Sequence, residues 1–108
     1  MARLRYSAKR ANEVLILGWD FVDALGETGD SLLGAQSVSV TVFRGTDPNP
    51  NGLKSGPALL ANTTQVIQQL QGGVAGVTYA LEFSVQTVGG NTLHGVGDDG
   101  LLPLLAVV

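Results

Sequence analysis

The stretch Val77-Thr-Tyr-Ala-Leu-Glu-Phe-Ser-Val85 decides the fold class of this chain. Its odd-numbered positions are all large and apolar, whereas its even-numbered positions carry Thr, Ala, Glu and Ser. A strand places successive side chains on opposite faces, so this period of two predicts a long strand with one face in a core. Residues 89–91, Gly-Gly-Asn, then predict a tight turn of the kind that joins antiparallel strands.

Further strands are expected on both sides of this segment. Val38, Val40 and Val42 alternate with Ser and Thr, which predicts a half-buried strand over residues 37–43. Residues 63–71 fit a helical face as well as a strand, and the flanking threonines and glycines favour the strand. The complete set of expected strands is 12–21, 37–43, 58–61, 63–71, 77–85, 92–95 and 101–108, the last with an edge position or bulge at Pro103.

The first of these strands differs from the others in its pattern. Residues 12–21, Asn-Glu-Val-Leu-Ile-Leu-Gly-Trp-Asp-Phe, are apolar almost without interruption. Strands covered on both faces read as continuous apolar runs, so a central position is expected for it. Residues 20–29 have room for one helical turn, and the prolines and glycines of residues 44–57 predict a loop without regular structure.

Short strands at turn-rich intervals predict an all-β fold, an antiparallel immunoglobulin-like β-sandwich of about seven strands, with an open barrel as the alternative. The 108 residues suffice for one domain. We expect an N-terminal arm or edge strand over residues 1–11 and the sandwich over residues 12–108. The absence of cysteine excludes disulfides and Cys-based metal sites, and only 14% of the residues are charged. Such low charge is a weak indication of a surface covered by neighbours.

The positive charge is concentrated at the start of the chain. Four of the six cations are Arg3, Arg5, Lys9 and Arg10, and the rest of the chain carries all nine carboxylates. A basic arm of this kind could dock on an acidic neighbour or on nucleic acid, but it lacks the interleaved aromatic residues typical of nucleic-acid binding. The chain has no apolar run long enough to span a membrane and no signal-peptide pattern, so we expect it to stay in a cytoplasm until assembly.

The region before the long strand resembles the corner that precedes the penultimate strand of fibronectin type III and immunoglobulin-like domains. The residues that carry this resemblance are Gly72, Gly73, Gly76 and Tyr79. In that corner a tyrosine begins the strand, and its hydroxyl is hydrogen-bonded to nearby backbone. The resemblance implies that Tyr79 fills the edge of the core while its hydroxyl satisfies a loop carbonyl.

A second resemblance covers about 95 residues. The layout is similar to that of small virion proteins of tailed bacteriophages, the fiber-tail adaptor or head-tail accessory proteins. The matching positions, in order, are Lys9, Glu13, Leu15, Trp19, Asp20, Leu25, Gly26, Val38, Val40, Gly72, Gly73, Gly76, Tyr79, Val85, Thr87, Gly90 and the tail Leu104 to Val108. The Trp-Asp order is reversed relative to the usual pattern, and the insertion at residues 95–102 is unusual.

This resemblance implies a non-enzymatic virion protein that is assembled in the host cytoplasm and binds no cofactor, nucleic acid or membrane. It would link neck or tail subunits to fibers or to other virion proteins, in several copies per particle. The alternative is a capsid decoration or an immunoglobulin-like module that binds carbohydrate on the host surface. The expected partner contacts are Arg3, Arg5, Lys9 and Arg10 in the arm, and Asp47, Pro48, Asn49, Pro50, Asn51, Gly52 and Leu53 in the loop. Removal of residues 1–10 should leave the fold intact and abolish incorporation.

For the histidine, the clustered carboxylates and the tryptophan, a structural role is favoured over a role in binding. The single histidine, His94, is expected on or near a turn. The carboxylates Asp20, Asp23, Glu27 and Asp30, and the pair Asp98-Asp99, are candidate calcium ligands, but turn and cap roles are favoured because their spacing fits no EF-hand. Trp19 could stack on a sugar, although a core position is favoured.

Overall fold

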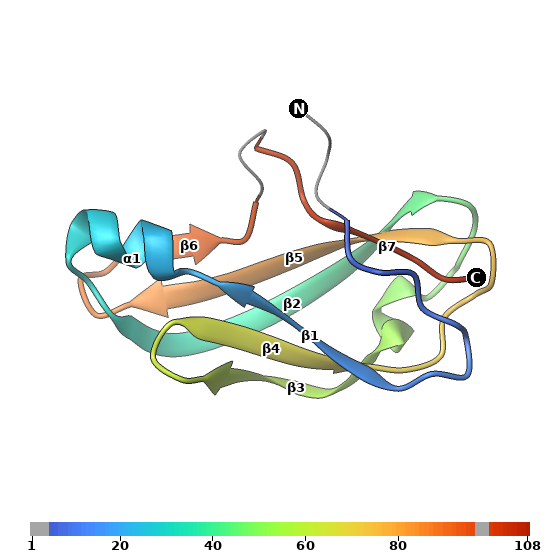
Figure 1. The fold of residues 1–108 in the computed structure, drawn as a ribbon, viewed down its shortest axis with the longest axis horizontal. Helices are drawn as coiled ribbons and strands as arrows, with labels where there is room; N and C mark the ends of the chain where they lie inside the picture. Colours follow the sequence, from blue (N-terminus) through green and yellow to red (C-terminus); the bar gives the residue numbers. More distant parts are fainter. Residues whose placement is uncertain (1–4, 97–99) are drawn as a thin grey trace.

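The chain folds into two antiparallel sheets packed face to face, as seen in a computed structural model that describes residues 5–96 and 100–108. The strands are β1 (Leu15–Asp20), β2 (Leu32–Arg44), β3 (Lys54–Ala61), β4 (Gln65–Leu70), β5 (Thr78–Thr87), β6 (Thr92–His94) and β7 (Leu104–Ala106). A short helix, α1 (Val22–Thr28), follows β1, and a 3-10 helix, η1 (Pro50–Leu53), precedes β3 (Figure 1).

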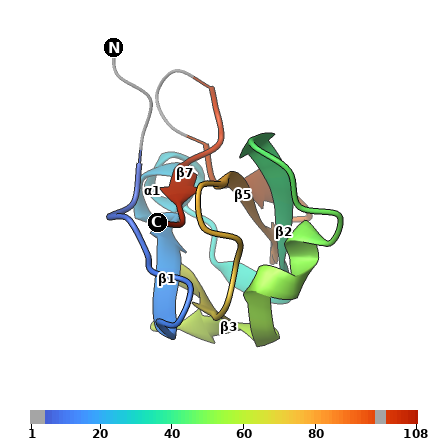
Figure 2. The same ribbon diagram turned by 90° about the vertical axis from the view of Figure 1, so that its right-hand side faces the viewer.

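One sheet has the order β1-β4-β3, and the other has the order β2-β5-β6. The strand β7 also pairs with β5, opposite residues 78–80, whereas β6 pairs opposite residues 84–86. The two short strands therefore divide one side of β5 between them. The view from the end of the molecule shows the two layers and the segments that connect them (Figure 2).

The alternation read from the sequence is confirmed in β5. Tyr79, Leu81, Phe83 and Val85 are each 0% exposed and form the centre of the core. The same holds on β2, where Val38 and Val40 are buried between exposed hydroxyl residues. These positions lie on one face of the β2-β5-β6 sheet, and Val66 and Leu70 of β4 are buried in the same core from the other sheet, which confirms the predicted all-β sandwich over the alternative open barrel.

The order of the strands also bears on the immunoglobulin-like class. If β1 is taken as strand B, the two sheets follow the orders B-E-D and C-F-G of that class. The N-terminal segment runs parallel to β7, with bridges between Arg5 and Leu104 and between Lys9 and Val107. This order supports the immunoglobulin-like class, which stays a prediction.

Two expectations about strands are wrong. The strand β1 is an edge strand of its sheet and not a central one, because only β4 pairs with it among the described residues. Residues 44–57 are a loop only as far as Asn49, since η1 and the first four residues of β3 follow. Regular pairing is possible there because Gly56, at φ +75°, and Pro57 lie in a bulge between two paired parts of β3.

The side chain of Gln68 fills this bulge. Its Nε2 donates to the carbonyl oxygen of Gly56 at 3.0 Å and to that of Gln69 at 2.9 Å, and the residue is only 2% exposed. The amide thus satisfies backbone groups that the bulge removes from the strand ladder. The sequence gives no period-two signal for this arrangement, so the prolines and glycines of residues 44–57 predict a loop there.

The helix α1 and the start of β2 are longer than expected. The helix has seven residues instead of one turn, and it ends at Gly29 with φ +67°. The strand β2 begins at Leu32 rather than near residue 37, with register shifts around Gly34. Ala35, at φ +53°, belongs to this irregular part. The bulges hide the alternation of the first residues of β2 from the sequence pattern.

Trp19 packs against the core and lies under the chain that follows β6. A Cβ atom added at Gly95 would meet Cγ and Cδ2 of the Trp19 indole at 2.8 Å. The Gly95 amide donates to the Phe83 carbonyl at 2.8 Å, which fixes the close approach. The predicted core role of Trp19 fits this position, and the rest of the unusual insertion includes residues 97–99, which lie outside the described residues.

Replacing Gly95 with Ala should therefore destabilise the protein by about 1–3 kcal/mol, because the added methyl overlaps the indole and the backbone cannot retreat. Gly26→Ala is the matched control. Gly26 lies inside α1 with no atom within 4 Å of an added Cβ, so the change should stabilise the helix by about 0.5–1 kcal/mol. Urea unfolding of both variants measures the two effects, and equal midpoints would contradict the packing of Gly95 on Trp19.

Candidate functional site

The turn between β4 and β5 is the corner that the sequence predicted. Gly72, Gly73 and Gly76 have φ angles of +64°, +96° and +90°, a region that side chains with a Cβ rarely adopt. At Gly73 space is also limiting, because an added Cβ would lie 3.0 Å from both Leu53 and Val107. The glycines therefore allow the chain to cross closely from one sheet to the other.

Tyr79 anchors this corner, although its hydroxyl has different partners from those expected. The hydroxyl donates to Oδ2 of Asp47 at 2.7 Å and accepts the Val74 amide at 3.0 Å. The donor bond thus goes to a carboxylate rather than to a loop carbonyl. Burial and the bond to Asp47 raise the pKa of the Tyr79 hydroxyl, and the Tyr79 bond, followed by the Asn49 amide, lowers the pKa of the Asp47 carboxyl.

The predicted contact loop is folded against the edge of β2. Asn51 Oδ1 accepts the Val40 amide at 3.1 Å, and the Lys54 Nζ donates to the Val38 carbonyl at 2.7 Å. These side chains take the place of a neighbouring strand and cover backbone groups that would otherwise be open to association. Leu53 is 1% exposed and belongs to the core, so its side chain is not on the contact surface where it was expected.

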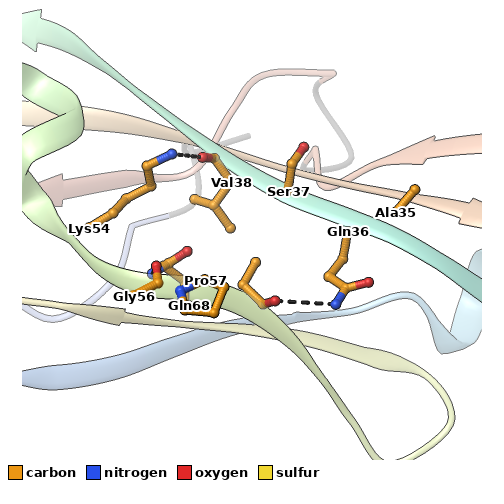
Figure 3. A pocket seen from close by; sticks show the side chains of 9 residues that line it. Ala35, Gln36, Ser37, Val38, Lys54, Gly56, Pro57 and Gln68 are labelled. Atoms are coloured by element: carbon orange, nitrogen blue, oxygen red, sulfur yellow. Dashed lines mark hydrogen bonds between the residues drawn. The ribbon is translucent and has the colours of Figure 1, made fainter.

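A cleft of about 420 Å³ opens beside these bonds, between the edges of β2 and β3. Figure 3 shows that two hydrogen bonds cross it, the one from Lys54 to Val38 and a second from the Gln36 amide to the Ala58 carbonyl at 3.2 Å. Gln68 lies at its base. The polar groups that line the cleft thus connect the two sheets along their open side.

The N-terminal segment is part of the body from residue 5 onward. Lys9 is 0% exposed, and its Nζ donates to the carbonyl oxygens of Gly72 at 2.7 Å and Arg10 at 2.8 Å. Burial lowers the pKa of the Lys9 amine, and the charge of Glu13 opposes this effect. Tyr6 packs against the core, and its hydroxyl donates to the Gly18 carbonyl at 3.0 Å.

The structure thus brings three of the predicted regions to one end of the sandwich, which we call the corner end: residues 9–13, residues 45–53 and residues 71–79 (Figure 1). Arg5 and Arg10 are exposed, whereas Arg3 lies outside the described residues. Because Tyr6 packs against the core and the Lys9 amine is bonded to the Gly72 carbonyl, we expect removal of residues 1–10 to weaken the fold, contrary to the expectation from the sequence, and its effect on incorporation stays a prediction.

The carboxylates of Asp20 and Asp30 accept hydrogen bonds from backbone amides. Asp20 accepts the Val22 amide at 3.0 Å, and Asp30 accepts the amides of Ser31 and Gly89 at 2.9 Å. A hydrogen bond from the Thr87 side chain is the largest cause that lowers the pKa of the Asp30 carboxyl. Among the described residues no group of three or more His, Asp or Glu side chains is placed to hold a metal ion. Asp98 and Asp99 lie outside those residues.

His94 and Trp19 both lie on strands of the sandwich, outside the corner end. His94 ends β6, and its Nδ1 lies 3.9 Å from the Glu82 carboxylate, with both side chains about half exposed. Trp19 is covered on one side by Gly95, as described above. These contacts place both residues on the framework of the sandwich.

The two tyrosine hydroxyls provide a matched test of the corner. Tyr79→Phe should destabilise the protein by about 1.5–3 kcal/mol, because it removes a bond to a carboxylate and leaves the Val74 amide without its acceptor. Tyr6→Phe removes one bond to a neutral carbonyl and should cost about 0.5–1.5 kcal/mol. Chemical denaturation of both variants compares them, and a smaller loss for Tyr79→Phe would contradict the anchoring role.

The lowered pKa of Asp47 gives the corner a pH dependence. A carboxyl with a lower pKa in the folded state than in the unfolded state stabilises the fold above its ordinary pKa of 3.8, and this contribution is lost as pH falls through the lowered value. The difference in unfolding free energy between wild type and Asp47→Asn should therefore shrink as pH drops below about 4. Thermal unfolding between pH 2 and 7 measures it, and a constant difference would be the contrary result.

The outer face of the β1-β4-β3 sheet contains exposed apolar residues that the sequence pattern does not predict. Ile16 and Leu59 are 61% and 53% exposed there. The continuous apolar run of residues 12–21 predicts a covered, central strand, whereas β1 lies at the edge of its sheet.

Within residues 5–96 and 100–108, no helix is long and apolar enough to cross a membrane.

Neither a curated protein nor a solved structure matches the chain. A protein family described as podophage GP4 fiber-tail adaptor protein gp77 matches residues 9–95, a span that begins at the buried Lys9 and ends at the Gly95 contact with Trp19. The chain belongs to this fiber-tail adaptor family.

Proposed function

We propose that the chain is a non-enzymatic structural protein of a podophage virion, which joins tail subunits to fibers and is present in several copies per particle. The observation that carries this proposal is the match of residues 9–95 to the fiber-tail adaptor family. Membership of that family indicates a structural adaptor in the virion. We add to this that the chain has no enzymatic activity, and we propose which partners it contacts and where.

The architecture suits an adaptor because side-chain hydrogen bonds hold the segments of the corner end together. At the corner end, three chain segments are connected by the bonds of Lys9 to Gly72 and of Tyr79 to Asp47. Loops that are held by side-chain and backbone bonds lose little conformational freedom when they bind, so more of the contact energy is available for affinity. A connector that transmits force between tail and fiber benefits from the same rigidity.

Partner contacts are proposed for the exposed part of this end. Pro48, Asn49 and Asn51 are accessible in the loop at this end, and Arg10 is accessible beside them. Arg5 is a further accessible cation outside the corner end, where its backbone pairs with Leu104. The arginines can form bidentate hydrogen bonds with carboxylates of a neighbour. Lys9 and Leu53 are buried, so they contribute to partner binding only by holding the exposed residues in place.

The structure offers little for the alternative role as a carbohydrate-binding module. Sugar sites use exposed aromatic faces, but Phe21, Tyr79 and Phe83 are at most 2% exposed, and Phe43, at 45%, is the one largely exposed aromatic side chain among the described residues. Trp19 has one side of its indole under Gly95. The adaptor role is therefore the one that the observations favour.

Particles assembled without this chain test the proposal. A phage in which its gene carries an early stop codon should produce tailed particles that lack fibers, and adding purified wild-type protein should restore fiber attachment. Electron microscopy of negatively stained particles counts the fibers. Particles that retain their fibers without the chain would contradict the adaptor role.

A further inference from the structure

The charged residues of the chain are divided between its two ends. Hydrogen bonds join residues 20–31, 62–64 and 86–92 at the end of the sandwich opposite the corner end. We call this the helix end, because α1 lies in it (Figure 1). Its three segments contain no lysine or arginine in their sequence. They contain four of the nine carboxylates of the chain: Asp20, Asp23, Glu27 and Asp30.

The corner end carries the opposite sign. Together with the two residues that flank its loop, it contains four of the six cations of the chain: Lys9, Arg10, Arg44 and Lys54. Only two carboxylates accompany them, and both are bonded within the chain. Glu13 accepts the Arg10 amide at 2.7 Å, and Asp47 accepts the Tyr79 hydroxyl at 2.7 Å. The corner end therefore has an excess of cations, whereas the helix end has only carboxylates.

These opposite charges are not paired within the molecule. Between the side chains that the structure describes, one ion pair is present, and it joins His94 to Glu82 away from both ends. Arg10, Arg44 and Asp23 are exposed. The molecule measures 41 Å along its longest axis, whereas charges at physiological salt are screened over about 8 Å. Attraction between the two kinds of end therefore acts only where the ends of different molecules meet.

Each end also exposes apolar side chains beside its charges. Val22 and Val88 are 50% and 62% exposed at the helix end, and Val74 is 43% exposed at the corner end. Protein interfaces commonly combine apolar contacts at the centre with polar groups at the rim, and complementary charges fix the orientation of the partners. Both ends thus offer the two components of an interface.

A head-to-tail arrangement of copies satisfies both ends at once. Two identical ends would repel each other, because each has an excess of one sign. The helix end of one copy, in contrast, brings carboxylates to the arginines of the next copy, where a guanidinium can form two parallel hydrogen bonds to one carboxylate. An unrelated partner would account for the charge of one end only. The charges therefore favour a second copy of this chain as the occupant.

The size of the ends indicates how strong such a contact is. Perpendicular to its longest axis the molecule measures 32 by 20 Å, which is less than the roughly 800 Å² that each partner buries in a stable complex. Exposed ion pairs also contribute little individually. Isolated copies should therefore associate weakly. Copies that are held side by side on a particle have a high effective concentration and make the contact readily.

We propose that the helix end of one copy docks on the corner end of the next copy, with Asp23 facing Arg10 and Arg44. This contact rests on the proposed function, since that function places several copies in one particle, and it identifies the neighbour of the corner end. The docked copies leave the outer faces of both sheets accessible to other virion proteins.

Sedimentation velocity of the purified chain tests the contact. The wild-type chain should form dimers and larger oligomers as its concentration rises in about 20 mM salt, and about 500 mM salt should weaken this association at least about tenfold, because salt screens exposed charges. Asp23→Lys should weaken the low-salt association at least about fivefold, because it places a cation opposite the arginines. The double variant Arg10→Glu/Arg44→Glu should do the same, because both contacting ends are then negative.

The matched control is Glu82→Lys, which makes the same change of charge as Asp23→Lys but lies away from both ends. Its association should stay within about twofold of the wild type. Thermal unfolding should show that the variants fold, because the altered side chains are at least partly exposed. Arg44→Glu alone replaces the double variant if the latter does not fold.

A mixture of the two weakened variants tests the head-to-tail order. Equimolar Asp23→Lys and Arg10→Glu/Arg44→Glu should form one-to-one complexes, although each variant associates poorly alone. The reason is that the unchanged corner end of the first variant then meets the unchanged helix end of the second. A symmetric contact between like ends would give no such rescue.

Two results would overturn the proposed contact. One is a wild-type chain that stays monomeric at low salt and high concentration, and the other is an association that Asp23→Lys or the arginine variant leaves intact. Both results leave the adaptor function standing. Conversely, particles that keep their fibers without the chain would contradict the adaptor function, and self-association of the purified chain would still show the contact.

Discussion

The burial of one face of β5 is the constraint on which the rest of the structure depends. Its residues at alternate positions, from Tyr79 to Val85, are inaccessible to solvent. The strand pairs with β2 along one side, and β6 and β7 pair with parts of its other side, so it is the central strand of its sheet, as β4 is of the other sheet. Slipping this strand by one residue would turn the core face outward, so the register of the whole sheet is tied to it.

A sandwich of this size must also deal with its open edges, and this chain does so with side chains. Asn51 and Lys54 bond to the edge of β2, and Gln68 fills the bulge of β3. The Lys9 amine donates a hydrogen bond to the Gly72 carbonyl in the corner, and the segment that contains Lys9 lies along β7. Buried backbone groups without a partner are costly, so polar residues at these points are as necessary to the fold as the apolar core.

These same points mark the limit of what the sequence predicts. Alternation identifies β5 and the centre of β2, because a period of two is a local property of the chain. The sequence predicts only residues 58–61 of β3, since Gly56 and Pro57 before them lie in a bulge whose backbone is bonded by Gln68, a residue twelve positions from Gly56 along the chain. The corner glycines and Tyr79 were found by resemblance, but the Asp47 partner was not, because a loop 32 residues away supplies it.

The edge strand β1 shows why an apolar run does not fix the place of a strand in its sheet. An uninterrupted apolar run predicts a strand covered on both faces, and that inference concerns burial rather than position in a sheet. The fold covers Leu15, Leu17 and Trp19, whose side chains pack against the core. Ile16 lies on the opposite face and is 61% exposed, and Gly18, next on that face, has no side chain to bury. The run is therefore apolar because one face is covered and the other contains a glycine and a single exposed isoleucine, so it predicts a strand with a core face but not whether that strand is central or at an edge.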